Sequence, residues 1–456
     1  MKLKDLTYGA ILKNLLIIAL PLTLTNLVNM AYNLTDMYWI GKVGYQAVTA
    51  IGTAGMFMWL AYGFFTLASS GTQIKVSHAV GEKDYEKLRE YAITGLKIAL
   101  FVGLAYGVVI FLFRSYAIDL YEIPTQLTAD WAKTYLGIVA FAVVFLAINN
   151  AYVGILNGLG NSTTVLLIST SGLAVNMILD PIFIHVLDMG VAGAALATLI
   201  ASMVPTILFT RFALKHTNIF EDFKLFRIHK DHVRVITKLS IPTSVQSLMF
   251  TLIAMSISKI VIDFGEEAMA VQRLGSQIES LTWMIGMGAN IAISVYVGQN
   301  FAAGKWRRLI KGYVLMFGIM SVYGAIITVF LYLAGGQLFD VFLDETYVIE
   351  MGATYLKILS LSQLGMMIET ICAGAFYGLG KTKIPSIISI VGNVLRLPLA
   401  MYLSNQFGVE GIWWAITISS ILKGLLNLIM FIIESVINEN IKFKYFIEKY
   451  DVNIEG

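Results

Sequence analysis

Long apolar runs, separated by short polar segments, dominate the sequence. The runs do not alternate between polar and apolar residues, as the strands of a membrane barrel would. Each is long enough for a helix that crosses the apolar core of a bilayer, which takes about 20 residues. We therefore predict an all-α membrane protein with twelve transmembrane helices, approximately at residues 14–40, 46–74, 91–113, 132–156, 163–187, 190–212, 239–262, 268–298, 312–334, 352–378, 384–404 and 411–436.

The two halves of the sequence repeat one pattern. Pro21 reappears as Pro242, and the Gly-Leu-Gly corner at 158–160 reappears at 378–380, an offset of about 220 residues. Each half then holds six helices. Because six is an even number, the two six-helix bundles are expected to be parallel, with pseudo-two-fold symmetry about an axis along the membrane normal.

The repeat and the positive charges predict the domains and their orientation. Most of the 32 Lys and Arg residues lie in connections on one side of the predicted helices, and positive loops face the cytoplasm. We expect a multi-pass protein of the cell (inner or plasma) membrane with both termini cytoplasmic. The predicted domains are an N-terminal bundle or N-lobe at 1–213, a cytoplasmic linker at 214–238, a C-terminal bundle or C-lobe at 239–437 and a cytoplasmic tail at 438–456.

Composition excludes several classes of protein. Hydrophobic residues make up 57% of the chain and charged residues 13%, with a net charge of +3, so neither a disordered chain nor a nucleic-acid-binding module is expected. We find no arrangement of residues for nucleophilic catalysis, and we predict that the protein is not an enzyme. His229 and His232 fall in the basic linker, where a solvated pair is expected rather than a metal site. Two parallel bundles favour a transporter whose central cleft opens alternately to each side.

Two acidic residues stand inside predicted helices of the first half. Asp36 corresponds to Ile257 in the second half, and Asp180 corresponds to Leu397. An ionisable group at membrane depth costs several kcal/mol, so it suggests a function by default. Two carboxylates among amide and hydroxyl oxygens can bind Na⁺, or can carry a proton when they are close together and poorly solvated. The alternative is structural: Asp36 at the membrane interface, and Asp180 at a helix end.

A polar stripe accompanies Asp36 along its helix. Tyr32 and Asn29 precede Asp36 by four and seven residues, and this spacing places them on one helical face. Such a stripe is not expected to face lipid. We therefore predict that Asn29 and Tyr32 line a substrate cavity.

The second half contains two intramembrane acids of its own, Glu279 and Glu369. These glutamates are candidates for contact with a cationic substrate. The alternative is a structural ion pair, for example between Glu369 and either Lys259 or Arg396.

Several segments resemble those of multidrug and toxic compound extrusion (MATE) transporters. They are Tyr-Asn-Leu-Thr-Asp-Met-Tyr-Trp-Ile-Gly at 32–41, Asn-Met-Ile-Leu-Asp-Pro at 176–181, Gly-Val-Ala-Gly-Ala-Ala-Leu-Ala-Thr at 190–198 and Val-Gly-Gln-Asn-Phe-Ala-Ala-Gly at 297–304. The resemblance covers essentially the whole chain. It implies cation-coupled antiport that exports amphipathic, often cationic, organic compounds. The partners are then small organic molecules and the lipid bilayer, and we expect a monomer. The alternative is a flippase for a lipid-linked precursor.

The prokaryotic branch of that family implies roles for particular residues. Pro21 matches the proline at which the first helix can bend, and Tyr135 and Asn150 match positions that line the first-bundle cavity. No cofactor is implied beyond the coupling ion, H⁺ or Na⁺, and the ion site would be a metal site only for Na⁺. The residues carried over to that coupling site are Asp36, Asn176, Asp180 and Thr198.

Overall fold

The computed structural model describes residues 4–123, 125–216, 229–342 and 345–437 of the chain. These residues form helices joined by short connections, without any strand. The all-α prediction is therefore confirmed. Part of the predicted linker, 217–228, and the whole predicted tail, 438–456, lie outside the described residues.

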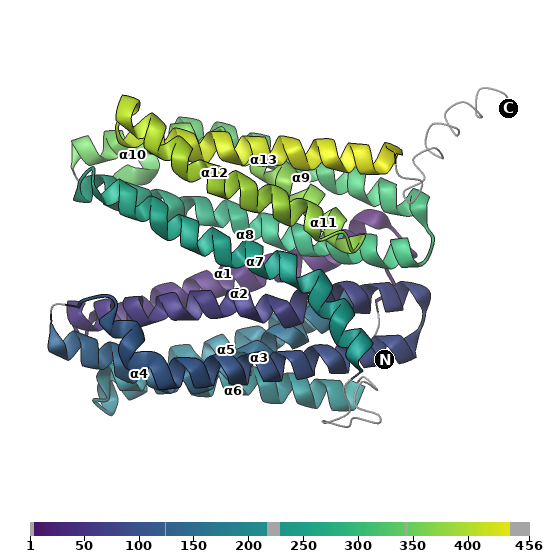
Figure 1. Cartoon of the computed structure of the whole chain (residues 1–456), viewed down its shortest axis with the longest axis horizontal. Coiled ribbons are helices and arrows are strands. Elements are labelled where there is room, and N and C mark those ends of the chain that lie inside the picture. Colours follow the sequence, from purple (N-terminus) through teal and green to yellow (C-terminus); the bar gives the residue numbers. More distant parts are fainter. Residues whose placement is uncertain (1–3, 124, 217–228, 343–344, 438–456) are drawn as a thin grey trace. The chain divides into compact units, whose positions relative to one another are not determined.

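The first half of the chain contains six long helices (Figure 1). Each coincides with a predicted helix, and several extend past the apolar run into polar residues. The helices are α1 (Ile11–Gly41), α2 (Tyr45–Glu82), α3 (Tyr85–Asp119), α4 (Gln126–Gly158), α5 (Ser162–Pro181) with a π-helical turn η1 (Ile182–Val186), and α6 (Gly190–His216).

The second half has the same order of helices with one interruption. Within the described residues, eleven helices are each long and apolar enough to cross a bilayer, and the bent pair α10 and α11 brings the number of spans to twelve. The helices are α7 (Lys230–Ile262), α8 (Glu266–Ala302), α9 (Trp306–Asp340), α10 (Thr346–Ser360), α11 (Gln363–Gly378), α12 (Lys383–Phe407) and α13 (Val409–Ile437).

The prediction of one continuous helix over 352–378 is wrong, because the chain bends by 42° between α10 and α11. Serine side chains at the break bond to backbone carbonyls one turn earlier. The Ser362 hydroxyl donates to the Leu359 carbonyl at 2.7 Å, and the Ser360 hydroxyl donates to the Lys357 carbonyl at 2.8 Å. Thr328 of α9 donates to the Ser360 carbonyl at 3.0 Å, which holds the broken turn against its neighbour.

Contacts divide the chain into two compact units. The first unit consists of Met1–Asp5 and Leu20–Ser244, and the second consists of Leu6–Ala19 and Val245–Gly456. These bounds differ from the predicted lobe bounds. The start of α1 packs with the second unit, and the start of α7 packs with the first unit. Helices α1 and α7 therefore each change unit along their length, close to Pro21 and Pro242 respectively.

Hydrogen bonds hold the start of α7 in the first unit and the segment before α1 in the second unit. Ser240 of α7 accepts from the Gly71 amide at 2.8 Å, and Ser244 donates to the Gly63 carbonyl at 2.6 Å, both within the first unit. The segment before α1 is held in the second unit, where Arg308 donates to the Tyr8 carbonyl at 2.8 Å.

Corresponding helices pack in the same way within each unit. In the first unit α4 packs on α2, α3 and α6, and α5 packs on α6. In the second unit α11 packs on α8, α9 and α13, and α12 packs on α13. Small residues permit close approach: a Cβ at Gly154 of α4 would lie 2.7 Å from the Ser69 carbonyl oxygen of α2. The repeat seen in the sequence is thus also a repeat of helix packing.

Candidate functional site

Asp180 is enclosed at the end of α5 and has an exposed fraction of 0%. Its Oδ1 accepts a hydrogen bond of 2.7 Å from the Asn176 amide one helical turn earlier. Its Oδ2 is buried without a hydrogen-bond partner. Pro181 has no N–H group, and the helix continues as the π-turn η1 directly after it. Irregular turns of this kind are frequent at functional sites.

The carboxyl group of Asp36, from α1, lies against that of Asp180 and interacts with it directly. Tyr135 of α4 contacts the Thr198 side chain of α6. Its side chain is also close enough to interact electrostatically with both carboxyl groups. Tyr32 of α1 lies within the same range. The structure therefore brings side chains from α1, α4, α5 and α6 of the first unit to one place.

Asp36 and Asp180 would be unfavourable neighbours if both carboxyl groups were ionised. Like charges in contact repel each other, and a buried oxygen without a partner costs free energy. A proton shared between Asp36 and Asp180 would remove both penalties, and so would a small cation held by oxygen ligands. The Thr198 hydroxyl donates to the Ala194 carbonyl at 3.0 Å, so its oxygen can still accept a hydrogen bond or coordinate an ion.

The remaining first-half candidates lie farther along the same helices. Asn29 is half-buried on α1, and Asn150 is half-buried on α4. Next to Asn150 lies a polar network that sequence reasoning missed. Asn149 donates to the Ser202 carbonyl at 2.8 Å and accepts from the Thr206 hydroxyl at 2.7 Å. The four-residue spacing of Ser202 and Thr206 on α6 was the available signal.

In the second unit Glu279 of α8 is buried and accepts a hydrogen bond of 3.3 Å from the amide of Gln363. Gln363 is the first residue of α11, directly after the helix break. Arg396 of α12 lies within electrostatic range of Glu279. The structure thus places this acid among polar groups within its own unit.

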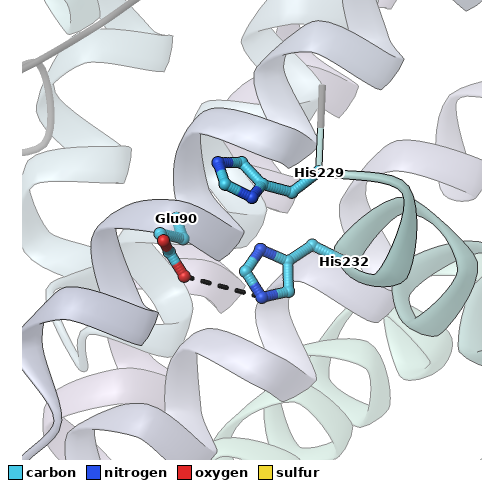
Figure 2. A group of neighbouring side chains, drawn as sticks. All are labelled: Glu90, His229 and His232. Atoms are coloured by element: carbon cyan, nitrogen blue, oxygen red, sulfur yellow. Dashed lines mark ion pairs between the residues drawn. The ribbon is translucent and has the colours of Figure 1, made fainter. Parts of the chain in front are cut away.

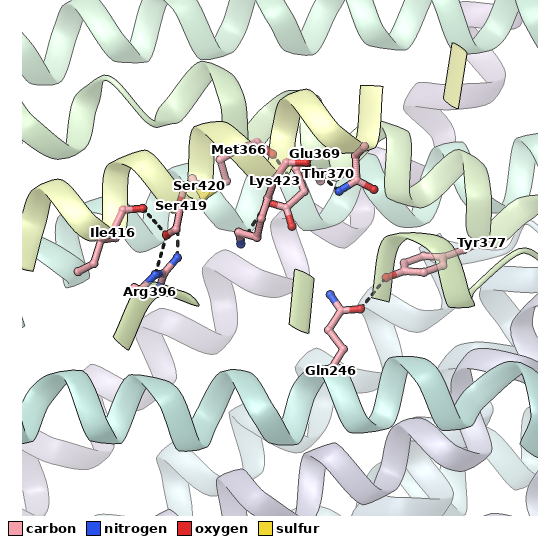
Figure 3. A network of polar contacts seen from close by, with 11 residues as sticks. Gln246, Met366, Glu369, Thr370, Tyr377, Arg396, Ile416, Ser419, Ser420 and Lys423 are labelled. Carbon is pink, nitrogen blue, oxygen red and sulfur yellow. Dashed lines mark hydrogen bonds and ion pairs between the residues drawn. The ribbon is translucent and has the colours of Figure 1, made fainter. Parts of the chain in front are cut away.

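Glu369 of α11 is ion-paired, and its partner is Lys423 of α13 at 3.2 Å (Figure 3). The sequence had suggested Lys259 or Arg396 as partners. Lys423 is buried, because Gly392 of α12 leaves room for its stem: a Cβ there would lie 2.4 Å from the Lys423 Cγ.

Arg396 is also satisfied within the second unit. Its Nε donates to the Ser419 hydroxyl at 2.8 Å, and its Nη2 donates to the Ser420 hydroxyl at 3.3 Å (Figure 3). Both serines come from α13. Four charged side chains of the second unit are therefore held by contacts between α8, α11, α12 and α13.

A sequence model of the MatE family matches residues 21–182 and 242–402, one match in each half and together most of the chain. The chain belongs to the MatE family. Its two matches correspond to the two halves of the internal repeat. The resemblance noted from the sequence segments is thereby confirmed.

Curated relatives and solved structures of the MatE family agree with this assignment. The chain is 25% identical to "Probable multidrug resistance protein NorM" of Thermotoga maritima, covering 92% of each. It is 26% identical to "Probable multidrug resistance protein YpnP" of Bacillus subtilis, covering 92% of the chain and 94% of the relative. Its fold is similar to that of the MATE transporter VcmN of Vibrio cholerae, with a TM-score of 0.88 at 19% identity over 94% of this chain and 98% of VcmN.

Membership of the MatE family has two direct consequences. The chain is a transporter rather than an enzyme, as its sequence predicted. It is also a multi-pass membrane protein, in agreement with its many long apolar helices.

Proposed function

We propose that this MatE-family protein is a cation-coupled antiporter that exports amphipathic, often cationic, organic compounds. The coupling ion is H⁺ or Na⁺, and its proposed ligands are Asp36, Asn176, Asp180 and Thr198. The two bundles give access alternately to the two sides of the cell membrane, with both termini in the cytoplasm. The protein works as a monomer.

The observation that carries this proposal is the contact between two acids, one of which is fully buried. Asp180 keeps one oxygen without a hydrogen-bond partner while the Asp36 carboxyl group lies against it. A cation or proton resolves that arrangement. Moving one elementary charge across the membrane provides about 2.3 kcal/mol per 100 mV, which suffices to drive a substrate outward.

The coupling step follows from the position of Asp36 on α1. When the site takes up a cation from outside, repulsion between Asp36 and Asp180 ends. The stripe of Asn29 and Tyr32 belongs to the same helix, so a bend at Pro21 moves the stripe together with Asp36. That movement reduces the cavity formed with Tyr135 and Asn150 and releases the organic compound. The empty site then returns to the inner side with a new substrate.

The substrate class rests on the relatives and on the charges of the second unit. The curated relatives are named for multidrug resistance. Glu279 is buried without an ion pair as close as that of Glu369, so we assign contact with a cationic substrate to Glu279 and a structural role to Glu369. The basic candidates for a flippase of a phosphate-bearing lipid are Arg396 and Lys259. Arg396 is already engaged by two serines, which does not favour that function.

The test is transport of a cationic dye in proteoliposomes with an imposed H⁺ or Na⁺ gradient. Asp36→Asn and Asp180→Asn each keep the shape of the side chain and remove its charge. Loss of one coupled charge should lower the steady-state dye gradient roughly 50-fold at 100 mV. The two gradients, imposed separately, identify the coupling ion.

The matched control is Asp130→Asn, which removes an exposed carboxylate that accepts a hydrogen bond from Gln126 of its own helix. It should leave the dye gradient unchanged. Full transport by both Asp36→Asn and Asp180→Asn would refute the site. Transport that responds to neither gradient would refute cation coupling altogether.

A further inference from the structure

Three potential metal ligands converge where α7 begins in the first unit (Figure 2). His229 directly precedes α7, and His232 lies in its first turn, so the two rings share one side of the helix. Glu90 reaches them from the second turn of α3. One ligand atom from each residue lies within 4.8 Å of the other two. The sequence alone suggested only a solvated histidine pair, because Glu90 lies some 140 residues away in the chain.

The contacts of His232 leave one of its ring nitrogens, Nδ1, without a hydrogen-bond partner. His232 Nε2 lies 3.5 Å from Glu90 Oε2, and the His232 ring packs on Tyr91 with ring centroids 4.8 Å apart. The other nitrogen, His232 Nδ1, is buried and has no hydrogen-bond partner. An ion pair with Glu90 accounts for Nε2 only. It explains neither the buried Nδ1 nor the approach of His229, whose ring stacks at 5.4 Å from that of His232.

The donor set selects a class of ion. Two imidazole nitrogens and one carboxylate oxygen are typical of zinc and ferrous sites, whereas Mg²⁺ and Ca²⁺ prefer oxygen ligands. Ligands at about 2.0–2.2 Å from the metal lie roughly 3.5 Å from one another. His229 is exposed and lies ahead of the first helical residue, so a rotation of its ring can close the remaining gap.

We propose that Glu90, His229 and His232 bind one divalent transition-metal ion of the zinc class, with water completing its coordination. The ion would fasten the first turn of α7 to α3. Because α7 continues into the second unit after Ser244, the metal would fix the start of a helix that joins the two units. This site shares no residue with the proposed coupling site, so either can fail without the other.

The experiment uses full-length protein purified in detergent without a polyhistidine tag and freed of metal with a chelator. Titration with Co²⁺ should give one equivalent of bound metal per chain and the visible absorption of a low-symmetry, nitrogen-ligated ion. Zn²⁺ should displace the Co²⁺ and raise the melting temperature. Mg²⁺ at the same concentration should do neither.

Variants assign the bound ion to these three residues. His229→Gln, His232→Gln and Glu90→Gln should each weaken Co²⁺ binding by roughly 100-fold or more, since loss of even an outer-shell partner costs 10–100-fold. His216→Gln, at the end of α6, is the matched control and should bind like the wild type. The proposal is wrong if the wild type binds less than one equivalent, or if His216→Gln weakens binding as much as His232→Gln does. The titration of the wild type decides the first point even if a variant fails to fold.

Discussion

Buried charged side chains in this protein differ in whether all their polar atoms have partners. Lys423 and Glu369 satisfy each other at 3.2 Å, which is what a structural pair requires. Asp180 keeps one oxygen unpaired although it is fully enclosed. Native proteins contain few buried polar atoms without a hydrogen-bond partner. Each one calls for an explanation, such as a transported or bound ion. The contrast separates the acid that we assign to coupling from the acid that we assign to stability.

Lys423→Met should destabilise the protein by about 3 kcal/mol, because it leaves the largely buried Glu369 carboxylate without its partner. The double variant Lys423→Met with Glu369→Gln removes both charges and should recover most of that loss. Chemical unfolding of the detergent-solubilised protein, followed by tryptophan fluorescence, measures both. A double variant no more stable than Lys423→Met would show that the pair is not the source of the effect.

At the scale of the helix, the sequence predicted which elements exist better than where they end. Apolar runs predict the part of a helix inside the bilayer, but α2 continues as a helix to Glu82, past the predicted end at residue 74. Side-chain bonds from Ser360, Ser362 and Thr328 lie at the break between α10 and α11, and an apolar run does not reveal such a break. The acids of α1 and α5 were found because their repeat partners are apolar. Burial of Lys423 was missed because it depends on Gly392 of another helix.

The start of α3 provides a prediction about pH. Asp84 caps this helix, and its side chain accepts a hydrogen bond of 3.0 Å from the Lys87 amide. That bond lowers the pKa of Asp84 below its ordinary value of 3.8. Because the unfolded chain then takes up the proton first, the stabilisation is present above about pH 4 and is lost as pH falls through the folded-state pKa.

Asp84→Asn is the matched variant, since asparagine also caps helices but does not titrate in this range. The melting temperature of the wild type should exceed that of Asp84→Asn near neutral pH, and the difference should shrink below about pH 4. A difference that stays constant from pH 7 to pH 3 would contradict the cap's ionic contribution.

At the scale of the whole molecule, the chain passes between its two compact units within helices α1 and α7 as well as before α1. A proline lies near each of the two helical passages, Pro21 in α1 and Pro242 in α7. A proline inside a helix removes one backbone hydrogen bond and permits a kink. These two positions correspond in the repeat, so both halves place a weakened turn where the helix leaves one unit for the other.

Pro21→Ala should therefore impair transport more than an equivalent change inside one unit. Alanine restores the missing N–H group and stiffens α1 between the second unit and Asp36, so ion uptake would no longer be converted into movement of the Asn29 and Tyr32 stripe. The control is Pro398→Ala, a mid-helix proline of α12 that stays within the second unit. We expect Pro21→Ala to lower the rate of dye transport about tenfold, a barrier increase of about 1.4 kcal/mol, while Pro398→Ala stays within about twofold of the wild type. Equal rates for the two variants would mean that bending at Pro21 does not link ion uptake to substrate release.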